Sequence, residues 1–338
     1  NDNTASDNTA FGHHALKLNS DGHSNVAMGA YAGDAITTGD WNVAIGKYAL
    51  SSTQTTNSNT AVGNEAMSSN TGEQNTAVGY QALRLNVDGN ANVSVGFETL
   101  MTSVSADYQT AVGYAALKYA TGGVNTAVGQ KAGGNIRAGV ENVAVGKEAL
   151  LSATNSDASN NTAVGTESMK VNTTGTQNAA FGKAAMILNT TGNYNTALGA
   201  YALKSNQTGS SNVAIGWQAM MTGQQAGSEN VAVGKDCLKN NTASGNVAIG
   251  TETMMDNTSG SENVAMGKLA MENSNSSSNT AIGYMAGRSM TGNSNVVIGH
   301  EVAKGSFTGA ENVIIGRRAG MDATSANYNT IVGNHAGG

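Results

Sequence analysis

Two pairs of acidic residues have a spacing that could support hydrolysis of a glycosidic bond. They are Glu148 with Glu167 and Asp236 with Glu252. If the members of a pair lie on adjacent turns of a regular chain, their carboxyl groups would be roughly 5 Å apart, the separation found in retaining glycosidases. Lys147 and Lys235 lie beside these acids and offset their charge. We therefore interpret the pairs as solvated surface acids and predict that the protein is not an enzyme.

The histidines are the other residues that could bind a ligand through side-chain chemistry. They are His13, His14, His23, His300 and His335. None has an acidic or thiol partner at the fixed spacing that a zinc site requires. The turn aspartates Asp21 and Asp88 likewise lack the alternating oxygen ligands of a calcium loop. We predict no metal site and no cofactor.

The single cysteine, Cys237, excludes a disulfide within the chain. It stands at a position where the repeat described below usually has alanine. A small buried residue is therefore the expected role, because a free cysteine packs like a small apolar side chain.

Half of the chain's 16 aromatic residues follow a recurring glycine by one or two positions. These eight are Tyr31, Tyr48, Tyr80, Phe97, Tyr114, Tyr201, Trp217 and Tyr284. The two positions are the most variable of the repeat, which predicts an exposed corner. Tyr80, Phe97 and Tyr114 fall in successive repeats and should form an aromatic strip for sugar rings or for a neighbouring subunit. The alternative is that these rings only pack over the turn.

The element that positions all these residues is a pentad of the type Asn75-Thr76-Ala77-Val78-Gly79, which occurs 20 times. The 19 intervals between copies are 17 residues in 12 cases, 16 in five, and 18 and 19 once each. A period of this length indicates a repeat architecture. The variation in spacing predicts a loop that absorbs the extra residues.

Within the pentad, residue character alternates as in a β-strand. The second position is Val or Thr in all but one copy, the third is mostly Ala, and the fourth is always apolar. One face of the strand should therefore pack inside the coil and the other against something else, and the pattern leaves open which is which. The fifth position is always Gly, which predicts positive φ or a neighbouring backbone that leaves no room for Cβ.

A 17-residue unit with two short extended segments and two turns cannot bury an apolar face alone, so it must stack on its neighbours. We predict an all-β, parallel β-solenoid of about 20 coils, about 95 Å long at the spacing of paired strands. The first pentad residue is Asn in 19 copies and Gln109 in the other. Stacked amides should form a hydrogen-bonded ladder. Representative ladder residues and strand-end glycines are Asn42, Asn75, Asn125, Asn212, Gly46, Gly79, Gly129 and Gly216.

Composition agrees with one elongated domain over residues 1–338. There is no proline, as expected where nearly every N–H joins a ladder. The net charge is −6 without a basic stripe, which argues against nucleic acid as a partner. No run of about 18 apolar residues is present, so we predict no membrane insertion. The sequence begins and ends part-way through a repeat, and we expect it to be a segment of a longer fibrous chain.

The pentads Asn42-Val43-Ala44-Ile45-Gly46 and Asn212-Val213-Ala214-Ile215-Gly216 resemble the head repeats of YadA-like trimeric autotransporter adhesins. The Thr-containing copies are similar to repeats in the shafts of phage tail fibres. This resemblance implies a left-handed β-roll, a parallel homotrimer and an extracellular location on a bacterial surface or a virion. The repeats here are longer than the typical adhesin repeat of about 14 residues.

The favoured function is a non-enzymatic extracellular fibre segment, the stalk or head of an adhesin or tail fibre. It would project or contribute to attachment to a glycan or protein receptor on a host-cell surface. Two alternative functions belong to other functional classes. One is a solenoid that binds ice or a glycan surface, although a flat Thr array is interrupted by Val. The other is a β-helical polysaccharide depolymerase.

Overall fold

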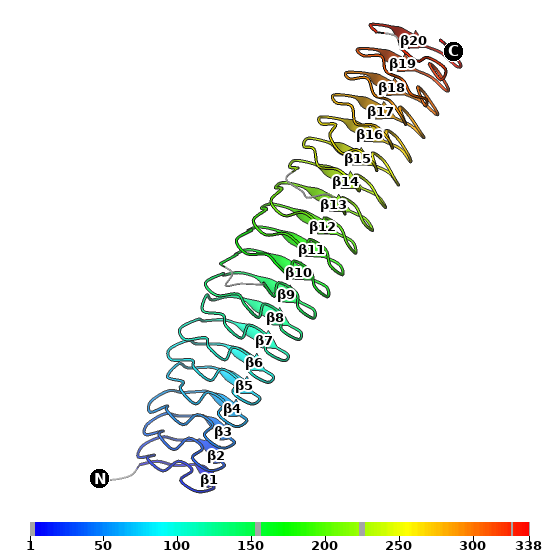
Figure 1. The fold of residues 1–338 in the computed structure, drawn as a ribbon. Helices are drawn as coiled ribbons and strands as arrows, with labels where there is room; N and C mark the ends of the chain where they lie inside the picture. The colour runs from blue at the N-terminus through cyan, green and yellow to red at the C-terminus, as the bar shows by residue number, and fades with distance from the viewer. Residues whose placement is uncertain (1–3, 153–156, 223–226, 326, 338) are drawn as a thin grey trace. The chain divides into compact units, whose positions relative to one another are not determined.

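The computed structural model describes residues 4–152, 157–222, 227–325 and 327–337. They form two units, residues 1–174 and 175–338, and each unit is described by itself. Each unit is a parallel β-solenoid, in which the chain winds through successive coils and contributes one short strand per coil (Figure 1). We number each coil by its strand, so that coil 8 contains β8.

All strands have three residues and coincide with positions two to four of the pentad. Unit 1 contains β1 (Thr9–Phe11), β2 (Val26–Met28), β3 (Val43–Ile45), β4 (Thr60–Val62), β5 (Thr76–Val78), β6 (Val93–Val95), β7 (Thr110–Val112), β8 (Thr126–Val128), β9 (Val143–Val145) and β10 (Thr162–Val164). Unit 2 contains β11 (Ala179–Phe181), β12 (Thr196–Leu198), β13 (Val213–Ile215), β14 (Val231–Val233), β15 (Val247–Ile249), β16 (Val264–Met266), β17 (Thr280–Ile282), β18 (Val296–Ile298), β19 (Val313–Ile315) and β20 (Thr330–Val332).

Successive strands pair in parallel, and equivalent positions lie side by side. Ala27 pairs with Ala44 in unit 1, for example, and Ala197 pairs with Ala214 in unit 2. The predicted all-β parallel solenoid with a period of about 17 residues is therefore confirmed. The two longest intervals include residues 153–156 and 223–226, so the predicted loops at those places lie outside the described residues.

The strand faces, which the sequence left unassigned, are now distinguished. The third pentad position points inward, and its alanines from Ala27 to Ala281 are buried, whereas Ala10 in the first coil is exposed. Positions two and four point outward from the sheet and stay partly or largely exposed. The core of each coil is completed by the third and fourth residues after the strand-end glycine, such as Ala49 and Leu50 in coil 3.

The predicted second extended segment is wrong, because no second strand occurs in any coil among the described residues, which outside the strands form turns, bends and irregular backbone with isolated bridges at Ile136 and Asn206. In most coils three non-glycine residues have left-handed backbone, as in coil 3, where Trp41, Tyr48 and Leu50 have φ of 55°, 57° and 49°. Left-handed residues interrupt an extended strand. The backbone still bonds between coils, since Leu50 N donates to Ala66 O at 3.0 Å and Tyr48 N donates to Ala30 O at 3.1 Å.

The strand-end glycine satisfies both conditions that its invariance suggested. Gly129 has φ of +134°, and a Cβ there would lie 2.7 Å from the carbonyl carbon and oxygen of Gly146 in the next coil. A side chain at this position would therefore require both unusual dihedral angles and displacement of the neighbouring backbone.

The first pentad residue forms a buried ladder, although most of its bonds join side chain to backbone. Asn42 Oδ1 accepts from the Asn59 backbone N at 3.0 Å, and Asn42 Nδ2 donates to Thr56 O at 2.8 Å in the next coil. Amide-to-amide bonds occur as well, as from Asn42 Nδ2 to Asn25 Oδ1 at 3.1 Å. We call the first pentad residues anchors. An Asn anchor such as Asn42 bonds to the coils on both sides, which penalises any residue without the same donor and acceptor.

Some coils have glycine where Leu or Met usually fills the core. The sequence predicted that an apolar residue three positions later occupies the same space in these coils, and the structure confirms it. A Cβ on Gly33 would lie 3.0 Å from Ile36 Cδ1, and a Cβ on Gly133 would lie 3.1 Å from Ile136 Cδ1. Both isoleucines are fully buried.

Candidate functional site

The turn after each strand carries the exposed aromatic residues that the sequence singled out. The structure brings five of the eight into two groups on successive coils. Tyr31 stacks on Tyr48 with ring centroids 5.1 Å apart, and Phe97 lies between Tyr80 and Tyr114 at 5.0 and 5.4 Å. Parallel stacking follows from the register, because equivalent positions of adjacent coils are one strand spacing apart.

The remaining three aromatic residues, Tyr201, Trp217 and Tyr284, do not stack on another of the eight. The Lys183 and Lys204 amino groups lie 5.9 and 5.6 Å from the Tyr201 ring, and Lys235 lies 5.3 Å from the Trp217 ring. Tyr284 packs against His300 at 5.1 Å. These rings mainly contact cations or a histidine on the coil surface.

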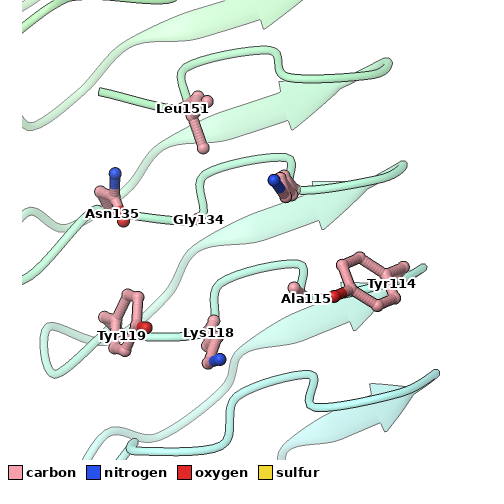
Figure 2. Close-up of a pocket in the computed structure, with 8 residues that line it drawn as sticks. Tyr114, Ala115, Lys118, Tyr119, Gly134, Asn135 and Leu151 are labelled. Atoms are coloured by element: carbon pink, nitrogen blue, oxygen red, sulfur yellow. The ribbon is translucent and has the colours of Figure 1, made fainter. Parts of the chain in front are cut away.

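Beside the row of Tyr80, Phe97 and Tyr114 is a recess of about 360 Å³, which we call the Gly134 recess. Its walls come from three successive coils of unit 1 (Figure 2). The lining residues are Tyr114, Ala115, Lys118, Tyr119, Lys131, Gly134, Asn135 and Leu151. The volume lies in the lower part of the range for small-molecule sites.

The recess exists because one side chain is missing from a stacked row. Lys118, Gly134 and Leu151 are each the fifth residue after their strand-end glycine, on coils 7, 8 and 9. Figure 2 shows them one above another. From Gly12 to Gly316, Gly134 is the only glycine at this place in the repeat. Gly134 itself is buried and forms the floor.

Charge in the recess is asymmetric. Lys118 Nζ donates to Glu98 Oε2 at 2.6 Å, and this bond raises the pKa of Lys118. The amino group of Lys118 and the guanidinium of Arg137 lie 5.3 and 5.5 Å from the Tyr119 ring. Lys131 is exposed, and no described carboxylate lies within ion-pair distance of it. Glu148 on the next coil attracts the Lys131 ammonium electrostatically but makes its close contact with Lys170. The recess therefore combines two phenol rings with an ammonium group that makes no direct ion pair.

A second hollow, of about 450 Å³, lies on the opposite border of the sheet in unit 1. Its lining includes Asp107, Tyr108, Val124, Val140 and Glu141. It is a shallow surface in which apolar and acidic side chains alternate, and no cation lines it.

The outward-facing side of the sheet is the largest uniform surface of each unit. We define this outer face as pentad positions two and four, which hold no charged residue in any of the 20 copies. More than a third of the side-chain surface is exposed at many of these positions. Examples are Phe11, Met28, Val78, Val93, Val128, Phe181, Leu198, Ile215, Ile249, Met266 and Ile282. Contiguous apolar surface of this kind marks interaction sites in soluble proteins.

The acidic pairs do fall on adjacent coils, but a lysine bridges one of them. Lys170 Nζ lies 2.7 Å from Glu148 Oε2 and 2.9 Å from Glu167 Oε1. Lys170, rather than the Lys147 suggested by the sequence, makes the close contact and lowers the pKa of Glu148. A glycosidase acid requires a raised pKa. Asp236 likewise pairs with Lys239 at 3.0 Å and Lys235 at 3.7 Å.

Three of the five histidines lie beside aromatic or acidic side chains. His13 and His14 stack at 3.9 Å beside Tyr31, and desolvation together with the nearby His13 lowers the pKa of His14. His300 lies 3.7 Å from Glu301. Across the described ranges, no group of three or more His, Cys, Asp or Glu residues could hold a metal ion. In the same ranges, no helix is long and apolar enough to cross a membrane.

Cys237 is buried, and its thiol hydrogen approaches Ala248 O with an Sγ to O distance of 3.2 Å. Desolvation raises the pKa of this thiol to about 12. Such a group stays protonated and unreactive at neutral pH.

Sequence reasoning missed a second buried amide row, seven residues after the strand-end glycine. Asn189 and Asn206, which match glycosylation triplets, are fully buried, and Asn206 Nδ2 donates to Asn189 Oδ1 at 3.0 Å. Asn86 Nδ2 donates to Asn70 Oδ1 at 2.5 Å in the same way. The available signal was the recurrence of Asn at a fixed offset from the glycine. It also missed the Gly134 recess, whose signal was the lone glycine at its repeat position.

The chain matches no protein-family model, and no curated protein sequence is similar to it.

Proposed function

We propose that this chain is a non-enzymatic segment of an extracellular fibre, on a bacterial surface or a virion, which assembles as a parallel homotrimer. The observation that carries the proposal is the outer face, an uncharged surface in which the fourth pentad position is apolar in every coil and the second is Val, Thr or Ala. In this proposal the coils wind left-handed, as the resemblance to adhesin and tail-fibre repeats implies. The assembled segment projects or contributes to a surface that binds a receptor.

A second copy of the chain is the partner that best fits the outer face. A partner must present complementary apolar rows at the coil spacing along many coils. Parallel copies in register have that spacing by construction, so each Val or Ile row meets an identical row. Closed rotational symmetry then satisfies all copies, as in most homo-oligomers.

The alternative of an ice-binding solenoid receives less support from the outer face. Thr occurs on adjacent coils only at Thr60 with Thr76 and at Thr110 with Thr126. All other Thr residues in this row are neighboured by Val or Ala. The row thus lacks a long array of hydroxyl groups.

Light scattering coupled to size-exclusion chromatography tests the proposal. We expect a mass near three times 34.1 kDa. Ile249→Glu, which places a carboxylate on the outer face, should dissociate the assembly because a buried unpaired charge is costly. Gln130→Glu adds the same charge at the exposed corner and should leave the mass unchanged. A monomeric or dimeric parent protein, or an Ile249→Glu variant of unaltered mass with a native circular dichroism spectrum, would refute the trimer.

A further inference from the structure

We propose that the Gly134 recess binds a single pyranose ring that carries a carboxylate, such as a hexuronic or sialic acid residue of a glycan. The inference rests on the attachment role of the proposed function, but it does not depend on the trimer. It uses residues of coils 7, 8 and 9 only, all in unit 1.

Shape is the first argument. Leucine, lysine, methionine or another side chain occupies this repeat position elsewhere, whereas Gly134 leaves the space above the coil unfilled. No left-handed backbone requires glycine here, because Gly134 lacks the positive φ of the strand-end glycines. A Cβ would lie 3.0 Å from Leu151 Cδ1, which is the movable end of a side chain, and 3.2 Å from the Lys131 carbonyl oxygen, which would have to move by a few tenths of an ångström. Side chains stand at the same repeat position in the neighbouring coils, as Lys118 and Leu151 do. The local fold therefore tolerates a larger residue, and the glycine creates the recess.

The rings supply the second argument. Tyr114 and Tyr119 stand at the two ends of the coil 7 segment that borders the recess, as Figure 2 shows. Tyr114 continues the stacked row of Tyr80 and Phe97. A phenol offers an apolar face for the C–H groups of a sugar and a hydroxyl for hydrogen bonding, which suits a ligand that is both apolar and polar.

Charge identifies the class of sugar. Two carboxylates lie close by, but Glu98 is paired with Lys118 and Glu148 is paired with Lys170. Lys131 interacts with Glu148 only at longer range and makes no direct ion pair, so its ammonium can bind an anion at the recess. Arg137 near the Tyr119 ring adds to the positive potential. A charge-assisted bond from ammonium to carboxylate is stronger than a bond between neutral groups. An acidic ring should therefore bind better than its neutral counterpart.

The experiment uses the full chain and three probes: methyl β-glucuronide, 3′-sialyllactose and methyl β-glucoside. Binding is followed by saturation-transfer NMR and by calorimetry. We expect at least one acidic probe to bind about tenfold more tightly than the glucoside at low salt, since loss of a charged partner costs at least about 1.4 kcal/mol. Lys131→Gln should remove most of this preference.

Gly134→Met tests the recess itself, because methionine occupies the equivalent position at Met101 and Met221. It should abolish binding of the acidic probe without changing the unfolding midpoint. Ser68→Met is the matched change at the same repeat position of coil 4, and Lys268→Gln removes an exposed lysine far along the sequence. Both controls should bind as the parent does.

Three results would overturn the site: no binding of either acidic probe at millimolar concentration, equal binding of the glucoside, or unaltered binding by Gly134→Met. Light scattering on the same samples separates this outcome from failure of the fibre proposal. A trimer that binds no acidic sugar contradicts the recess alone. A monomer that binds it through Lys131 contradicts the assembly alone.

Discussion

Gln109 shows how sharply a single residue departs from the repeat. It replaces the anchor Asn, and in the described structure its buried Oε1 has no hydrogen-bond partner. Its Nε2 instead donates to Ser103 Oγ at 3.2 Å. The extra methylene moves the amide away from the place where Asn Oδ1 accepts the next anchor's N–H. The ladder is therefore interrupted at coil 7.

Gln109→Asn should accordingly stabilise the protein. Restoring an acceptor for a buried donor is expected to add about 1 kcal/mol to the free energy of unfolding, after the loss of the Ser103 bond. Urea denaturation followed by circular dichroism measures the change. Asn92→Gln, which creates the same defect one coil earlier, should lower stability by about 1 to 3 kcal/mol. Equal midpoints for all three proteins would contradict the role assigned to the ladder.

Cys237 provides a prediction about pH. The pKa of its thiol is about 12 in the folded protein against an ordinary value of 9.0. Above pH 9 the unfolded chain therefore loses this proton while the folded chain keeps it, so stability falls as pH rises from about 9 toward 12. We expect Cys237→Ala to lessen this decline and to be close to neutral at pH 7, because alanine is the usual residue there.

Urea midpoints of the parent and Cys237→Ala at pH 7, 9 and 10 provide the measurement. The gap between the two proteins should move in favour of the alanine variant as pH increases. The folded parent should also resist a thiol reagent at pH 8 and react once urea is added. Rapid labelling of the folded protein would show that the thiol is accessible, against its buried position.

The sequence predicted residue roles well where a residue recurs, and poorly where residues compensate for one another. The small third pentad residue and the strand-end glycine follow from the repeat, whereas the inward direction of the alanines was established only by the structure. Departures from the repeat were explained only by the structure. Ser94 and Thr99 both replace Ala, and their hydroxyl groups form a buried hydrogen bond with an Oγ to Oγ1 distance of 2.7 Å. Similarly, a Cβ on Gly320 would lie 3.3 Å from the side chain of Ile314, which fills that space from the strand. Such pairs are close in space and carry no fixed spacing along the chain.

At the scale of the element, the end of each strand is the point most sensitive to substitution. We expect Gly129→Val to lower the free energy of unfolding by at least about 3 kcal/mol, combining strained dihedral angles with displacement of the Gly146 backbone. Thermal and urea unfolding provide the measurement. Gly305→Ala is the control, because Gly305 has no positive φ and its nearest contact would be Met321 O at 3.4 Å. If Gly129→Val unfolds like the control, close contact with the Gly146 backbone is not the reason that this position is glycine.

The three-residue strands were visible in the sequence because alternation marks them directly. The remainder of the coil was not, because its backbone mixes left-handed residues with bends, and residues such as Leu, Met, Glu and Tyr occupy left-handed positions that they rarely adopt. Contacts with the adjacent coils impose these conformations. Local sequence preference therefore gave two extended segments where the structure has one.

At the scale of the whole molecule, equivalence of the coils predicts which deletions are tolerated. Removing residues 76–92 joins Asn75 to Val93 and eliminates one complete repeat while preserving the pentad. We expect the variant to retain the circular dichroism spectrum and cooperative unfolding of the parent, since neighbour contacts differ only by one interface.

Removing residues 76–84 instead should misalign the core and the amide rows, because nine residues is about half of the period. This variant should lose cooperative unfolding or fail to fold. If the two deletions behave alike, the coils are not interchangeable and the stacked description is incorrect. Assembly state and ligand also belong to this scale. The outward positions of the repeat indicate an interface, but the repeat specifies neither the number of copies nor the ligand.

One-to-one pairing of equivalent positions has a consequence for how such a chain changes over generations. A gene that encodes near-identical units can gain or lose whole units by unequal recombination, and every product retains matched partners at each junction. The number of coils can then vary among descendants in steps of one, while a rare unit such as coil 8 keeps its distinctive surface in each product.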